Sequence, residues 1–190
     1  MELALERVKP LSKTVVKEVT MAVAITIGYF TLCVINPFQS VTAFLSLTLP
    51  NVRIAEALRP LSLRSLGAVA GISTGAWMYN LYTGKALLGV YPAIPVIMGA
   101  IWTGVHFASK AWGKSYKKDL TLVALGGLAT GLLVTLHLTS LAILLQGSVW
   151  SEALKFGALW KIASHVIVPV MSYMLFNSVK GLYEANRNSK

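Results

Sequence analysis

Long segments without a single charged residue dominate this sequence. Residues 19–34 carry no charge, and neither do residues 120–145. A helix needs about 20 mainly apolar residues to cross the hydrocarbon core of a bilayer. Hydrophobic residues make up 55% of the chain and charged residues only 13%, whereas soluble domains carry about 25% charged residues. We therefore expect an all-α integral membrane protein.

The pattern of apolar segments predicts six membrane-spanning helices in a single domain over residues 19–180. An amphipathic lead-in at the cytoplasmic surface, residues 1–18, precedes this domain, and a polar tail, residues 181–190, follows it. The segment 38–50, which has a proline at each edge, is expected to form a partly buried loop on the outer side. The predicted spans are residues 19–34, 51–62, 66–82, 90–112, 120–145 and 154–179.

The basic residues predict the orientation of these spans. Most of the 17 Lys and Arg residues fall in segments that we assign to one side, with Arg59 and Arg64 in one turn there. Lys and Arg concentrate in cytoplasmic loops of membrane proteins. Both termini should therefore be cytoplasmic, which requires an even number of spans. The net charge of +10 belongs to these loops. No basic run is interleaved with aromatic residues as a nucleic-acid surface requires, so we expect no nucleic-acid partner.

The segment 51–61 combines charge with irregular backbone inside this apolar chain. Arg53 and Glu56 are three residues apart, a spacing that puts both side chains on one helical face. Pro60 has no N–H, and its ring crowds the carbonyl of Glu56, so the helix should be short or kinked. Ionisable side chains inside a membrane mark functional sites. The alternative is a structural ion pair at the start of a helix.

The sequence Val52-Arg53-Ile54-Ala55-Glu56-Ala57-Leu58 resembles the RI(S/A)EAL signature of the QueT family. Members of that family are membrane-embedded substrate-binding subunits (S-components) of energy-coupling factor (ECF) transporters, linked to queuosine precursors. The resemblance implies a six-helix S-component fold in the cell membrane. It also implies uptake of a small heteroaromatic substrate, with a transmembrane coupling subunit and two ATPase subunits as partners.

Two further features bear on this resemblance. Ala24 and Gly28 lie four residues apart on the first predicted span, and small residues at that spacing let another helix approach closely. The resemblance implies that these two residues dock the coupling subunit. The chain also departs from the family, because no carboxylate occurs between Arg59 and Gly71.

Polar and aromatic side chains gather at the predicted outer ends of the helices and suggest one outward-facing pocket beneath the segment 38–50. Trp rings would stack on a flat ligand, and carboxylate, amide and amine groups would read its edge. A tryptophan in the middle of a span also needs a partner for its indole N–H or a cavity. The candidate substrate-binding residues are Arg53, Glu56, Asn80, Trp102, Trp150, Glu152, Trp160, Lys161 and His165.

The sequence contains no recognised motif for catalysis. It lacks G-x-x-x-x-G-K-[ST], so we expect no ATP hydrolysis by this chain alone. It also lacks H-E-x-x-H, and no His is paired with a carboxylate at metal-ligand spacing. We therefore expect a binding protein without metal or other cofactor rather than an enzyme. Two alternatives stay open: a secondary carrier coupled to H⁺ or Na⁺ through Glu56, and a small intramembrane enzyme or assembly factor with Lys161 and His165 as reactive groups.

Overall fold

The computed structural model describes residues 12–35, 54–84, 93–113, 115–146 and 152–188. These residues form helices joined by short turns, without any strand. The loop expected at 38–50 lies outside the described residues, and so does Arg53. The helices are α1 (Lys13–Ile35), η1 (Ile54–Leu63), α3 (Leu66–Tyr82), α4 (Ala93–Ala111), α5 (Tyr116–Gln146) and α6 (Glu152–Asn188).

Three helical segments in the described part of the chain are long and apolar enough to cross a membrane. They are Lys13–Ile35, Tyr116–His137 and Lys161–Glu184. Large apolar side chains cover their outer surfaces, with Ile27 and Leu175 each more than three-fifths exposed. An all-helical chain with such surfaces indicates a helical membrane protein. Helices α1 and α6 also extend beyond the predicted spans, because α1 begins within the lead-in and α6 continues through Asn188.

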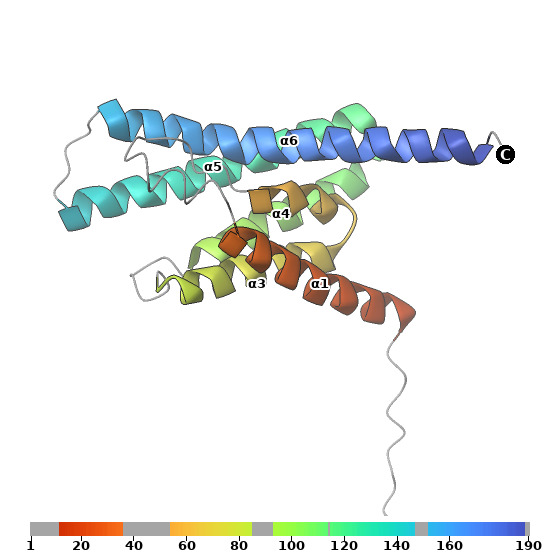
Figure 1. Ribbon diagram of the computed structural model, residues 1–190, viewed down its shortest axis with the longest axis horizontal. Helices are drawn as coiled ribbons and strands as arrows, with labels where there is room; N and C mark the ends of the chain where they lie inside the picture. The colour runs from red at the N-terminus through yellow and green to blue at the C-terminus, as the bar shows by residue number, and fades with distance from the viewer. Residues whose placement is uncertain (1–11, 36–53, 85–92, 114, 147–151, 189–190) are drawn as a thin grey trace, which may run out of the picture.

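Two helix pairs flank the molecule, with η1 and α4 between them (Figure 1). In the first pair, α1 packs against a row of glycines on α3, namely Gly67, Gly71 and Gly75. A Cβ atom on Gly71 would lie 2.6 Å from the carbonyl oxygen of Ala22, so this contact tolerates no side chain. The glycine row is therefore a packing surface inside the protein. Ala24, by contrast, is exposed on α1.

In the second pair, α5 packs against α6 through Gly127 and Gly131. A Cβ atom on Gly131 would lie 2.9 Å from the Cα of Ile162 and 3.2 Å from the Cβ of His165. Because neither glycine has a side chain, the α6 backbone can approach α5 closely at this level. This approach fixes the position of His165 in the bundle.

The element η1 contacts every other described helix. It is a 3-10 helix of 10 residues, whereas 3-10 runs longer than about four residues are uncommon. Pro60 accounts for part of this geometry, since it cannot donate the α-helical hydrogen bond to the carbonyl of Glu56. In a 3-10 helix the carbonyl of Ala57 would accept from the N–H of residue 60, which proline lacks. The Ser172 hydroxyl donates to that carbonyl instead, at 2.7 Å. At the far end of η1, Nδ1 of His106 lies 2.8 Å from the carbonyl oxygen of Ser62.

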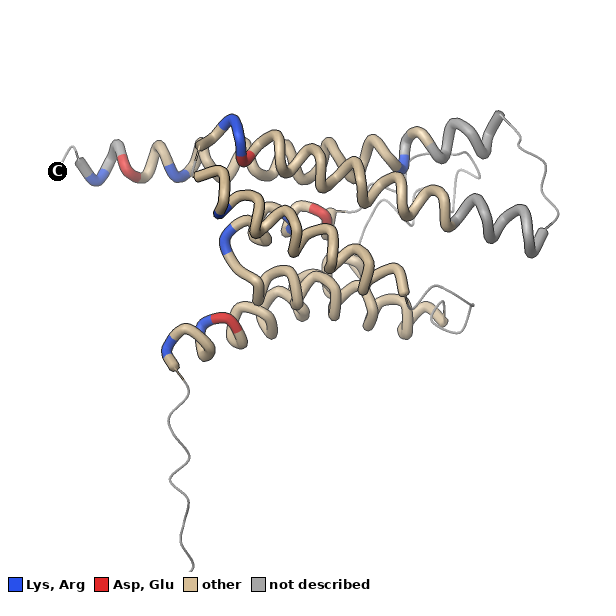
Figure 2. The backbone as a smooth tube through the Cα atoms, turned by 180° about the vertical axis from the view of Figure 1, so that it is seen from behind, with Lys and Arg blue, Asp and Glu red and all other residues tan. Residues whose placement is uncertain are grey.

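Most of the described basic residues lie at the end of the molecule where α1 begins and α6 ends (Figure 2). A buried carboxylate, Asp119, ties the elements together at this basic end. It accepts hydrogen bonds from Ser109 of α4 at 2.8 Å, from Tyr173 of α6 at 3.2 Å and from Arg64, after η1, at 3.2 Å. Glu18 of α1 accepts a hydrogen bond from the backbone N–H of Gly67 at 2.6 Å, at the start of α3.

Candidate functional site

The 3-10 geometry of η1 places charged side chains in the middle of the molecule. A 3-10 helix has three residues per turn, so Glu56, Arg59 and Ser62 form one row along it. Glu56 and Arg59 are each 1% exposed, and Ser62 is fully buried. The prediction that Arg59 lies in a cytoplasmic turn is therefore wrong. Its side chain faces the bundle interior, because the three-residue repeat keeps it in line with Glu56.

Glu56 is surrounded by hydrogen-bond donors. Its Oε2 atom accepts from Nε of Arg59 at 2.6 Å. Its Oε1 atom accepts from the Tyr29 hydroxyl at 2.7 Å and from Nη2 of Arg59 at 3.4 Å. A carboxylate has about four lone-pair positions, and these three hydrogen bonds occupy three of them. The imidazole of His165 lies beside the carboxylate as well, so Glu56 has little capacity left for a ligand in this arrangement.

The guanidinium of Arg59 lies between aromatic rings and the carboxylate. It lies 5.4 Å from the ring centre of Trp102 and 5.9 Å from that of Tyr29. Attraction between a cation and an aromatic face contributes about 2 kcal/mol where both are desolvated. The indole N–H of Trp102 donates to the Thr130 hydroxyl at 3.0 Å, which is the partner that a buried tryptophan requires. Trp102 is therefore part of the wall that holds Arg59 in place.

His165 of α6 completes the cluster from the side opposite α1. Its Nδ1 atom lies 3.2 Å from Oε2 of Glu56, within ion-pair distance but outside hydrogen-bond geometry. The side chain is 1% exposed, and its Nε2 atom has no hydrogen-bond partner among the described residues. A buried imidazole nitrogen without a partner is costly. Nδ1 of His165 and the hydroxyl of Ser62 also have no hydrogen-bond partner among the described residues, so the cluster has capacity for further hydrogen bonds at these atoms.

The structure brings three of the nine predicted binding residues together, namely Glu56, Trp102 and His165. Asn80 is half-buried at the end of α3, where its backbone carbonyl accepts from Thr83, and Lys161 is half-buried one turn before His165. Arg53 and Trp150 lie outside the described residues. The backbone at Glu152 and Trp160 belongs to α6, but their side chains are outside the described part.

Sequence reasoning missed Tyr29 and Arg59 as members of this cluster. Arg59 carried a usable signal, because it is three residues after Glu56 just as Arg53 is three residues before it. In an apolar segment, either neighbour can neutralise the carboxylate. Tyr29 carried no comparable signal, since aromatic residues are common in membrane spans.

The cluster can bind a ligand, orient it and exchange protons with it. Arg59 and Glu56 neutralise each other, so the site is close to neutral unless His165 is protonated. Comparisons of the chain with protein-family models, curated proteins and solved structures find no match.

Proposed function

We propose that this chain is the substrate-binding membrane subunit of an ECF-type importer and captures a small heteroaromatic micronutrient, similar to a queuosine precursor, from outside the cell. The observation that supports this most is the position of Glu56. The residue belongs to the RI(S/A)EAL-like signature, and its carboxylate lies 1% exposed at the centre of a helical bundle. Ionisable groups at such depth in a membrane are typical of substrate and ion sites.

In this proposal Glu56 organises the site and other groups contact the ligand. Its carboxylate already holds Tyr29 and Arg59, so a ligand amine would have to displace one of them. Nε2 of His165, which has no hydrogen-bond partner among the described residues, would bond the edge of a heteroaromatic ring. A cationic aminomethyl group on the ligand needs a carboxylate of its own. On the outer side, Glu152 is the remaining candidate for that role.

The proposal also includes the topology and the partners. Six spans with both termini in the cytoplasm are supported by the basic end of the molecule, which carries the beginning of α1 and the end of α6 (Figure 2). The chain has no ATP-binding loop of the G-x-x-x-x-G-K-[ST] type. A transmembrane coupling subunit and two ATPase subunits would therefore drive release inward. Ala24, which is exposed, and Gly28, which is half-buried one turn further along α1, would form the docking face.

A thermal-shift titration of the purified protein tests the substrate. The probes are a 7-deazapurine with an aminomethyl group, the same ring without that group, and unrelated vitamins. We expect the aminomethyl compound to raise the melting temperature of the parent and of Glu184→Gln, which removes an exposed carboxylate at the opposite end of α6. Glu152→Gln should abolish the shift. If no heteroaromatic compound shifts the parent protein, the proposed substrate class is wrong.

A proton-coupled carrier is the second candidate, and the 3.2 Å approach of His165 to Glu56 is the observation that favours it. An imidazole beside a buried carboxylate can exchange a proton with it, as proton relays in membrane transporters do. Proteoliposomes that contain only this chain distinguish the two candidates. A carrier accumulates substrate when a pH gradient is applied, whereas an importer subunit accumulates none until the coupling and ATPase subunits and ATP are supplied.

A further inference from the structure

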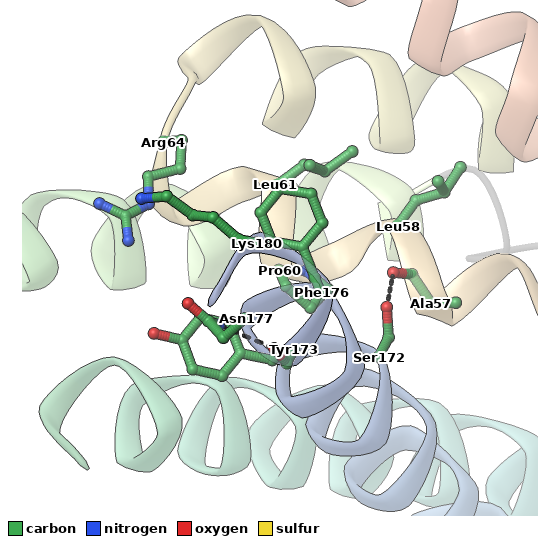
Figure 3. Close-up of a pocket in the computed structure, with 10 residues that line it drawn as sticks. All are labelled: Ala57, Leu58, Pro60, Leu61, Arg64, Ser172, Tyr173, Phe176, Asn177 and Lys180. Carbon is green, nitrogen blue, oxygen red and sulfur yellow. Dashed lines mark hydrogen bonds between the residues drawn. The ribbon is translucent and has the colours of Figure 1, made fainter. Parts of the chain in front are cut away.

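A groove of about 500 Å³ lies between η1 and the C-terminal half of α6. It lies on a different face of η1 from the Glu56–Arg59 pair. Leu58, Leu61 and Phe176 form its apolar walls, and Arg64 and Lys180 lie together at one end (Figure 3). The groove is thus apolar along its length and basic at one end.

The repeat of η1 explains this arrangement. Three residues per turn put Leu58 and Leu61 in one row, and Arg64 follows them just after the helix ends. On α6, Phe176 and Lys180 are four residues apart and share a face. On both η1 and α6, the apolar side chains come before the cation in the sequence, and the cation lies nearer the basic end of the molecule. Helices α1 and α6 do not contact each other over their described residues, so the groove is open to the surroundings on that side.

Both cations keep hydrogen-bond donors for a ligand. The Arg64 side chain is 50% exposed and uses Nη2 to bond Asp119 at 3.2 Å. A guanidinium has five N–H donors, so most of its donors stay available. The Lys180 side chain is 61% exposed, and its Nζ lies 3.6 Å from Glu184. An exposed pair at that distance contributes little and is easily exchanged for another anion.

We propose that this groove binds an anionic phospholipid of the surrounding bilayer, with its phosphate between Arg64 and Lys180 and one acyl chain along Leu58, Leu61 and Phe176. Basic pockets between membrane helices on the cytoplasmic side bind anionic headgroups. The volume of the groove favours a lipid over a helix of a partner protein. One turn of a helix about 10–12 Å across occupies about 400–600 Å³, so the groove would hold only a single turn. Its mainly apolar lining suits an acyl chain, which is much thinner than a helix. This proposal does not depend on the transported substrate.

Native mass spectrometry of the purified protein in a non-ionic detergent tests the proposal. The protein is titrated with dioleoyl phosphatidylglycerol and, separately, with dioleoyl phosphatidylcholine. We expect tighter retention of phosphatidylglycerol by the parent. Lys180→Gln should weaken that retention about fivefold, the effect of one cation near a charged headgroup, and should leave phosphatidylcholine unchanged. Lys180 is exposed, so its replacement should not alter the melting temperature.

Two controls separate a specific groove from general attraction to a basic surface. Arg187→Gln removes an exposed cation further along α6, outside the groove, and should not change phosphatidylglycerol retention. Glycerol 3-phosphate, the headgroup without chains, should fail to displace the lipid at equal concentration. Equal retention of the two lipids overturns the proposal. So does an Arg187→Gln effect as large as that of Lys180→Gln, or displacement by glycerol 3-phosphate.

Discussion

Replacing Glu56 by Gln tests whether the interior ion pair maintains the fold or only the site. The change preserves the shape of the side chain and leaves Arg59 buried at 1% exposure without a counter-charge. The rings of Tyr29 and Trp102 are present before and after the change, so they do not compensate. Breaking a buried pair on one side costs about 3–5 kcal/mol. At about 2–4 °C per kcal/mol for a chain of this size, the melting temperature should fall by roughly 6–20 °C.

The double variant Glu56→Gln/Arg59→Met provides the matched comparison. It removes both charges, and the glutamine oxygen can still accept from the Tyr29 hydroxyl. Replacing a whole buried ion pair with uncharged side chains is often neutral or stabilising, by about 1–4 kcal/mol. We therefore expect the double variant to melt close to the parent, while Arg59→Met alone is as damaged as Glu56→Gln alone.

Thermal unfolding of all four proteins in one detergent, without ligand, gives the coupling free energy between the two positions. The reasoning is refuted if each single variant melts within about 2 °C of the parent, because a buried uncompensated charge would then be tolerated. It is also refuted if the double variant loses the sum of the single losses. Ligand titration of the stable double variant then separates the two roles. A folded protein that no longer binds ligand shows that the pair serves the site.

Three further predictions concern packing, docking and topology. Gly71→Ala should lower the melting temperature, because its Cβ would lie 2.6 Å from a backbone oxygen of α1, and overpacking costs about 1–3 kcal/mol. Gly104→Ala should be neutral or stabilising in the same assay, because no atom of another described element lies within 4 Å of its Cβ position. Ala24→Leu should abolish uptake by the assembled importer and leave ligand binding intact, whereas equal loss of both would assign this face to internal packing. A reporter fused after Lys190 should read out as cytoplasmic, and an extracytoplasmic signal would contradict the six-span topology.

The helices could be predicted from the sequence more fully than the site. Charge-free segments fix where a membrane helix can lie, and the expected span 66–82 has the bounds of α3. Pro60 led us to expect a short or kinked second helix, and η1 is indeed short, with 10 residues. The beginning of α1 and the end of α6 were not predicted, because charged residues near a helix end are compatible both with a continuing helix and with a tail. Lys13 to Glu18 and Lys180 to Asn188 are such segments.

The site could be predicted only in part, because its members come from four separate helices. Glu56 was predicted from its charge in an apolar segment and from the resemblance of residues 52–58 to RI(S/A)EAL. The partner of Glu56 could not be identified from the sequence, because Arg53 and Arg59 are each three residues away from it. The rule that assigns basic residues to the cytoplasmic side does not distinguish a buried arginine from one in a loop. That Arg59 faces inward follows from the three-residue turn of η1. Sequence alone predicted a break at Pro60 but not the type of helix that surrounds it.

The 3-10 geometry links the interior cluster to the groove on α6. In an α-helix, each residue advances by about 100°, so residues 56 and 62 would point about 120° apart. In η1 they are aligned, and the alternate row, Leu58 and Leu61, is aligned toward the groove. Pro60 disfavours conversion to the α form, and the Ser172 hydroxyl bonded to Ala57 ties this geometry to α6. A shift of α6 relative to η1 would therefore change the groove through Phe176 and the interior cluster through His165 at the same time.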